Sequence, residues 1–259
     1  MNSDKNAIMH VATSAILKAS RALINAENIK LIKRQELRKR FMENLIIKIE
    51  KNIISMLHRA FSRHHYIGLT SGEHNNKESE YTWYINAING SENFLHGIPH
   101  CCLSVIMKFR NTVEIAVIYN PYLDQLFRST KGCGAQLNSH RIRVSQTASL
   151  EECVFSKMHS VSEYESYPTI LLKLQKKIKT LRYSGSTLLD ICYVAAGFLD
   201  GIWITEKTKV LNLEAALLIL KESGGIITSL LKNCSGKSVL IGGNSRIITT
   251  ISEFVNATK

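Results

Sequence analysis

The chain has 259 residues, of which 45% are hydrophobic, and it carries a formal net charge of +12 at pH 7. This length and apolar content exclude an intrinsically disordered chain and allow one large domain with a sizeable core. The sequence contains neither an unbroken run of about 18 apolar residues nor the pattern of a secretory leader, so we expect a cytoplasmic protein without a membrane-spanning helix.

Two helices are predicted at the start of the chain. Apolar residues recur there at helical spacing, first from Ile8 to Ala19 and then from Phe41 to Leu57. Segments rich in β-branched and aromatic residues follow, and they predict strands over Tyr81–Ile85, Leu103–Met107, Val113–Tyr119, Gln125–Ser129 and Arg141–Val144. The first part of the chain therefore reads as helices followed by a sheet.

Strands and helices alternate in the second part. The patterns predict helices over Leu171–Lys179, Ser186–Ala196 and Leu213–Glu222, and glycines follow the last two of them. No low-complexity linker interrupts the chain. We therefore predict a single mixed α and β unit over residues 1–259, with approximate halves 1–145 (α+β) and 146–259 (α/β).

Cysteine spacing and charge say less about function. The six cysteines form no Cys-x-x-Cys pair, which favours reduced, partly buried thiols over a zinc or redox site. The run from Lys33 to Arg40 is typical of a solvated helix face. The alternative explanation of the positive charge is an RNA or other anionic partner.

One segment points to specific chemistry. Residues 83–94 read Trp-Tyr-Ile-Asn-Ala-Ile-Asn-Gly-Ser-Glu-Asn-Phe. This segment resembles the signature of the inositol monophosphatase family, Trp-x-Ile-Asp-Pro-(Ile/Leu)-Asp-Gly-Thr-Thr-Asn-Phe. The tryptophan, the glycine and the closing Asn-Phe are retained, whereas asparagine stands in place of both aspartates.

The resemblance continues along the chain. Further segments match family motifs at the family's spacing, namely Val117–Pro121, Lys131–Asn138, Gly185–Gly201, Glu222–Gly225 and Gly243-Asn244. Together they cover about residues 41–250. Within the family, the bacterial SuhB branch is the most similar.

The resemblance implies a layered α/β/α/β/α sandwich, a homodimer and a Mg²⁺-dependent phosphomonoesterase. In the family, a glutamate, three aspartates and a backbone carbonyl hold the metal ions, and a threonine positions the attacking water. The corresponding positions here are Leu69, Asn86, Ile88 (through its backbone carbonyl), Asn89 and Asn212, with Ser91 at the threonine position. A further family aspartate falls at Ile46.

These replacements remove the charge that attracts the metal. Four carboxylates become three neutral amides and one alkyl side chain, whereas Mg²⁺ prefers anionic oxygen ligands. We therefore predict no metal cofactor and a catalytically inactive or strongly impaired protein that acts in binding or regulation. The alternative is a weak Mg²⁺-dependent phosphomonoesterase on inositol-1-phosphate or a related sugar phosphate. A relocated metal site would have to draw on other carboxylates, namely Glu73, Glu78, Glu80, Glu206 and Glu214.

Other parts of the family site are retained. The resemblance implies that Gly90, Ser91, Gly185 and Ser186 still form a phosphate pocket, because backbone amides at a helix start bind anions. Asp190 is expected to be structural. The SuhB branch is associated with transcription and RNA processing, which makes an RNA or transcription-machinery partner one candidate, beside a homodimer and without a membrane.

Overall fold

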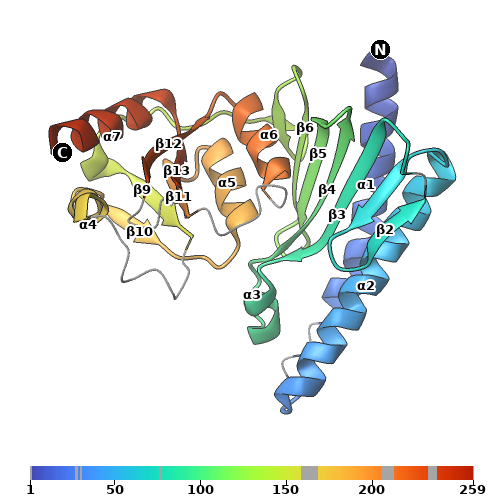
Figure 1. The fold of residues 1–259 in the computed structure, drawn as a ribbon. Coiled ribbons are helices and arrows are strands. Elements are labelled where there is room, and N and C mark those ends of the chain that lie inside the picture. The colour runs from blue at the N-terminus through green and yellow to red at the C-terminus, as the bar shows by residue number, and fades with distance from the viewer. Residues whose placement is uncertain are drawn as a thin grey trace.

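The structure is a computed structural model that describes residues 2–26, 29, 31–75, 77–158, 169–205, 213–232 and 238–258 (Figure 1). The helices are α1 (Asn2–Asn25), α2 (Gln35–Ala60), α3 (Ser91–His96), α4 (Thr169–Gln175), α5 (Thr187–Ala195), α6 (Glu214–Glu222) and α7 (Ser245–Thr258). The first sheet contains β1 (His65–Gly68), β2 (Gly72–Asn75), β3 (Tyr81–Asn89), β4 (Cys102–Phe109), β5 (Thr112–Asn120), β6 (Gln125–Thr130), β7 (Ala135–Leu137) and β8 (His140–Arg141). The second contains β9 (Val154–Lys157), β10 (Thr180–Arg182), β11 (Gly201–Thr205), β12 (Ile226–Lys232) and β13 (Ser238–Gly243).

The two sheets and the helices stack in five layers. Helices α1 and α2 cover one face of the eight-stranded sheet, α5 and α6 lie between the two sheets, and α4 and α7 cover the far face of the five-stranded sheet (Figure 1). This is the α/β/α/β/α sandwich that the family resemblance implied. The division into halves 1–145 and 146–259 stays a prediction. The core between the two sheets contains residues from both halves.

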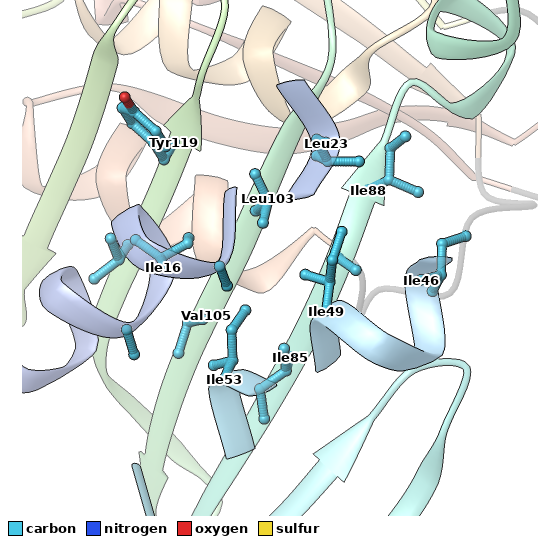
Figure 2. Packing of buried hydrophobic residues seen from close by; sticks show 14 of the residues in the cluster. Ile16, Leu23, Ile46, Ile49, Ile53, Ile85, Ile88, Leu103, Val105 and Tyr119 are labelled. Carbon is cyan, nitrogen blue, oxygen red and sulfur yellow. The ribbon is translucent and has the colours of Figure 1, made fainter. Parts of the chain in front are cut away.

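The first core lies between α1, α2 and the large sheet. Most residues of the helical stripes predicted from the sequence point into it, with Ile16, Ile49 and Ile53 fully buried against Ile85 and Val105 (Figure 2). Phe41, at the start of the second stripe, lies outside this core and is 43% exposed. Helix periodicity on one side and strand alternation on the other thus bury matching apolar faces. The order β3-β4-β5-β6 is an antiparallel meander, whereas β1 pairs with β3 in parallel.

Two predicted elements differ from the structure. The strand expected over Arg141–Val144 keeps only Arg141 in β8, because Val144 leaves the ladder and its amide bonds to the carbonyl of Ser223. The helix expected over Leu171–Lys179 corresponds to α4, which ends at Gln175. Its end is set by tertiary pairing, since the amide of Lys179 bonds to the carbonyl of Leu150 as the chain enters β10.

Helix α1 qualifies the expectation about membranes. By length and composition alone, Lys5–Asn25 could cross a membrane. Within that segment 39% of the most apolar window is buried in the protein, and α1 packs on α2, β4 and β5. Packing in the first core therefore accounts for the apolar residues of α1.

Candidate functional site

A β-bulge near the end of β3 places the two signature asparagines on one face of the sheet. Asn86 pairs with Ser104 and Asn89 pairs with Cys102, so β3 holds one more residue than β4 over this stretch. Without the extra residue, side chains three positions apart would point to opposite faces. With it, Asn86 and Asn89 both face α5 and α6.

The bulge also explains the residues between them. Ala87 and Ile88 are consecutive, yet both are buried in the first core on the opposite side of the sheet (Figure 2). Ile46, where the family has an aspartate, packs into this same core. An aspartate there would face an apolar environment, so the alkyl side chain fits its surroundings.

Asn86 and Leu69 line a very small space. The cavity between β3, β4 and the start of α6 holds about 10 Å³, and its wall includes Leu69, Asn86, Ser104 and Ala215. That is about the volume of one water molecule. The Asn86 side-chain oxygen accepts a hydrogen bond from the amide of Ile88 at 3.1 Å, so part of its acceptor capacity is already used.

Asn89 is engaged with the neighbouring helix. Its Oδ1 accepts hydrogen bonds from the Leu188 amide at 3.1 Å and from the Ser186 hydroxyl at 3.0 Å. Leu188 lies in the first turn of α5, whose amides lack partners within the helix. The side chain expected to be a degenerate metal ligand therefore caps α5.

The residues predicted to form a phosphate pocket do come together. Gly90 has a left-handed backbone (φ 91°), and a Cβ on it would stand 3.2 Å from the Cβ of Ser186 and 2.8 Å from the carbonyl oxygen of His100. Ser91 is the first residue of α3. Gly185 packs against Asn93, where an added Cβ would be 2.9 Å from Oδ1. Neighbouring atoms leave no room for a side chain at either position, which explains why both residues are glycines.

Asn93 ties these loops together. Its amide nitrogen donates to the carbonyls of His100 and Ser184, each at 2.7 Å, across 91 residues in the second case. Asp190 adds a second tie, because its Oδ2 accepts from the hydroxyls of Ser156 and Ser184 at 2.6 Å. Oδ2 of Asp190 is therefore occupied by hydrogen bonds within the fold, which fits the structural role expected for this residue.

A cavity of about 440 Å³ lies beside this junction. Its lining includes Asn93, Lys157, Gly185, Ser186 and Thr187. The ammonium of Lys157 lies 5.6 Å from the centre of the Tyr183 ring. Sequence patterns did not single out Lys157 as a residue of this cavity. A lysine at the end of a buried strand is nevertheless a signal for a residue that lines a site.

Glu50 is a second residue that the patterns missed. It is fully buried in α2, and its carboxylate accepts hydrogen bonds from the amides of Thr70 (3.2 Å) and Ser71 (2.7 Å). It therefore holds the turn that carries Leu69. The sequence signal is a charged residue inside an otherwise apolar helical stripe, between Ile49 and Ile53.

The alternative carboxylates do not gather into a metal site. Glu73 pairs with Lys77 at 2.5 Å, and this ion pair lowers the pKa of Glu73. Glu80 pairs with Arg110, and Glu214 pairs with Lys108 at 2.6 Å. Glu206 lies outside the described residues. Over the part of the chain that the structure describes, no three His, Cys, Asp or Glu side chains cluster as metal ligands.

Taken together, the described family positions do not fit Mg²⁺. Leu69 offers no donor atom, the oxygens of Asn86 and Asn89 accept internal hydrogen bonds, and the space beside Leu69 is water-sized. Asn212 lies outside the described residues, so its side chain is known by identity alone.

The cysteines behave as ordinary thiols where they are described. Cys101, Cys102, Cys153 and Cys192 are buried and free, and Cys133 is free and exposed. Burial raises the pKa of Cys101 and Cys153 to about 12 and that of Cys102 and Cys192 well above the usual range. These buried thiols therefore stay protonated at neutral pH.

Comparison with known proteins agrees with this fold. A sequence profile of the Inositol monophosphatase family matches residues 4–256. The chain is 33% identical over 224 residues to Nus factor SuhB of Buchnera aphidicola subsp. Baizongia pistaciae, covering 84% of each chain. It is 32% identical over 232 residues to Nus factor SuhB of Vibrio cholerae, covering 85% of this chain and 84% of that one.

Solved structures show the same likeness. The extragenic suppressor protein suhB from Bartonella henselae superimposes with a TM-score of 0.82 at 28% identity, covering 96% of this chain and 98% of that chain. The inositol monophosphatase from Anabaena gives a TM-score of 0.80 at 26% identity, covering 98% and 97%.

Proposed function

The chain belongs to the inositol monophosphatase family, and we propose that it keeps the family scaffold without the metal-dependent phosphatase reaction and acts as a binding or regulatory protein. The proposal needs no metal cofactor. It rests on what stands at the positions where the family has carboxylates.

The observation that carries the proposal is the hydrogen bonding of Asn86 and Asn89. The side-chain oxygen of each accepts a backbone amide hydrogen, from Ile88 and Leu188 respectively. A cation would have to compete with those bonds without help from any net charge. One unit charge about 4 Å from a cation is worth about 4 kcal/mol at an effective dielectric of about 20, so the lost carboxylates weaken binding greatly even after desolvation is counted.

Phosphate release tests the proposal directly. The wild-type chain is compared with the variant Leu69→Glu/Asn86→Asp/Asn89→Asp/Asn212→Asp on inositol-1-phosphate with millimolar Mg²⁺. The expected result is no release above background by the wild type and measurable release by the restored variant. Robust wild-type turnover that requires Mg²⁺ would instead establish the alternative, a weak phosphomonoesterase.

Metal binding provides a test that does not depend on turnover. Calorimetric titration with Mn²⁺ should give no resolvable binding to the wild type and should reveal binding in the restored variant. A wild-type site of micromolar affinity would contradict the proposal, since three amides and an alkyl group cannot supply it.

Support for an RNA or transcription-machinery partner comes from charge and from the names of the relatives. The net charge is +12, and the stretch before and at the start of α2 exposes Lys33, Arg34, Lys39 and Arg40. The matched proteins from Buchnera and Vibrio are named Nus factors. A partner that carries phosphates would meet this exposed basic stretch.

Salt-dependent RNA binding distinguishes a specific basic surface from general attraction. The variant Arg34→Gln/Lys39→Gln/Arg40→Gln should bind single-stranded RNA more weakly, with the log–log salt slope reduced by about 2. The matched control, Lys173→Gln/Lys176→Gln/Lys177→Gln, removes the same charge from the α4 region. Equal losses in both variants would refute a basic surface centred on α2.

The proposal also includes a homodimer, as the resemblance implied. Light scattering coupled to size-exclusion chromatography should give about twice the chain mass of 29.2 kDa. A monomer at micromolar concentration would remove this part of the proposal and leave the loss of metal binding untouched.

A further inference from the structure

Another cavity lies along α1, on the opposite face of the large sheet from Asn86. It holds about 510 Å³ between one side of α1 and the hairpin formed by β6 and β7. Its α1 wall includes His10, Thr13 and Ser14, and its hairpin wall includes Arg128, Cys133 and Gln136. This volume lies within the range of about 300–1,000 Å³ typical of small-molecule sites.

Strand geometry explains why the cavity exists. Along β6, Leu126 and Arg128 share one face, and Leu126 packs on the first core beneath α1 and α2. Helix α1 contacts β4 and β5, so the sheet continues past the helix at β6 and β7. The polar side of α1 and the uncovered end of the sheet therefore enclose the space between them.

Two buried polar atoms on these walls have no hydrogen-bond partner among the described residues. They are Nε of Arg128 and the hydroxyl Oγ1 of Thr13. The other end of the Arg128 guanidinium is held, since its Nη2 donates to the Gln136 side chain at 3.2 Å and to the Asn138 carbonyl at 2.9 Å. Buried polar groups are nearly always paired, so these two call for an acceptor within reach.

The charges around the cavity specify the acceptor. Its walls carry the arginine and a histidine and, among the described residues, no aspartate or glutamate. Two nearby carboxylates, Glu222 of α6 and Glu114 of β5, do not line the cavity and are engaged with other groups. Glu222 accepts the amides of Gly132 and Gly134 at 2.8 Å each, and Glu114 lies between Lys5 and Lys131. A fixed guanidinium beside hydroxyl groups suits an oxyanion.

We propose that the cavity between α1 and the β6–β7 hairpin binds a small organic anion, whose phosphate or carboxylate oxygens accept hydrogen bonds from Arg128 and Thr13. The site is independent of the missing metal ligands, because the sheet separates the two. It gives the chain a ligand of its own whether or not the family reaction survives.

Cys133 offers a local readout. It lines the cavity and is exposed, whereas the other described cysteines are buried. Its alkylation by iodoacetamide is followed by mass spectrometry of the peptide that contains it, with inorganic phosphate, succinate or chloride at equal ionic strength. An anion bound near Arg128 should slow the reaction by 1 + [L]/Kd, or about tenfold at ten times Kd. Anions bound near Ser186 would not change this rate.

Variants assign the protection to the site. Arg128→Gln and the nearly isosteric Thr13→Val should each reduce the protection severalfold, whereas the exposed control Arg63→Gln should retain it. Protection by phosphate alone identifies a phosphorylated ligand, and protection by succinate alone a carboxylate. If neither probe protects Cys133, the proposal is overturned. It is also overturned if the protection survives in Thr13→Val. The Thr13→Val variant alone is sufficient for this test if Arg128→Gln fails to fold.

Discussion

The side-chain oxygen of Asn89 accepts a hydrogen bond from the backbone amide of Leu188 at 3.1 Å, across 99 residues of sequence. This bond joins the end of β3 to the first turn of α5. The family has a metal-binding aspartate at the position of Asn89, but here the side chain stabilises a helix. Hydrogen bonding therefore connects β3 and α5 at the position where a neutral amide replaces the family's carboxylate.

Asn89→Leu should destabilise the fold, because it removes the cap from the first turn of α5. Loss of such a cap costs about 1 kcal/mol, with a range of about 0.5–2 kcal/mol. Asn89→Asp keeps the acceptor and adds a favourable charge near the helix start, so its stability should equal or exceed that of the wild type. Urea unfolding measures both. Equal destabilisation by the two substitutions would show that the oxygen of Asn89 is not a cap.

Glu50→Ala should be more harmful than Glu50→Gln. The alanine variant leaves the amides of Thr70 and Ser71 without their buried acceptor, which should cost about 2–4 kcal/mol in the free energy of unfolding. The glutamine variant keeps one acceptor oxygen and should lose less. Hydrogen exchange at Thr70 and Ser71 reports the local effect. Unchanged exchange in Glu50→Ala would contradict the assigned role.

Gly68 offers an independent check of the same contact. A Cβ at this position would stand 2.4 Å from Oε2 of Glu50 and 2.1 Å from the hydroxyl oxygen of Ser71. Gly68→Ala should therefore displace the carboxylate and speed exchange at the same two amides. Gly132→Ala in the β6–β7 hairpin serves as a control. A Cβ at Gly132 would meet no atom within 4 Å, but the positive φ of this residue strains any side chain, so the variant shows the effect of backbone strain without a clash.

Lys108 and Glu214 should show strong energetic coupling. Their side chains meet at 2.6 Å and are 6% and 24% exposed, and the Lys108 ammonium lies 4.9 Å from the centre of the Tyr84 ring. Lys108→Met should cost about 3 kcal/mol because it leaves Glu214 without its partner. Adding Glu214→Leu should recover a large part of that loss. Additive effects in the double-mutant cycle would show that the pair does not interact.

Acidification should weaken the fold through His64. Its Nδ1 accepts a hydrogen bond from the indole of Trp83 at 3.0 Å, and burial lowers the pKa of His64 below its ordinary value of 6.5. The unfolded chain then binds the proton more readily, so this contribution is present above pH 6.5 and is lost as pH falls toward the lowered folded pKa.

His64→Asn tests this, because an amide oxygen can accept from Trp83 without titrating. Between pH 7.5 and 5, the fall in the melting temperature should be smaller in this variant than in the wild type. His140→Asn, which changes an exposed histidine, serves as the control and should leave the fall unchanged. The same pH dependence in all three proteins would exclude His64 as its source.

Local patterns in the sequence predicted most of the scaffold. The apolar stripes around Ile16 and Ile53 became the buried faces of α1 and α2, and the apolar runs around Val105 and Val117 became β4 and β5. These elements follow from periodicities within single segments, which a sequence displays directly. Tertiary pairing overrode the pattern at Val144 and beyond Gln175, where the backbone bonds to distant carbonyls.

The sequence by itself determined the family resemblance and the identity of the missing ligands, because both depend only on which residue occupies which position. Tertiary structure alone decided what those positions do now. A bulge turned Asn89 toward α5, the fold brought Glu50 to the turn of Leu69, and Lys108 met Glu214 across 106 residues. Such contacts depend on how the layers orient and bury side chains that lie far apart in the sequence. The spacing of residues along the chain does not predict them.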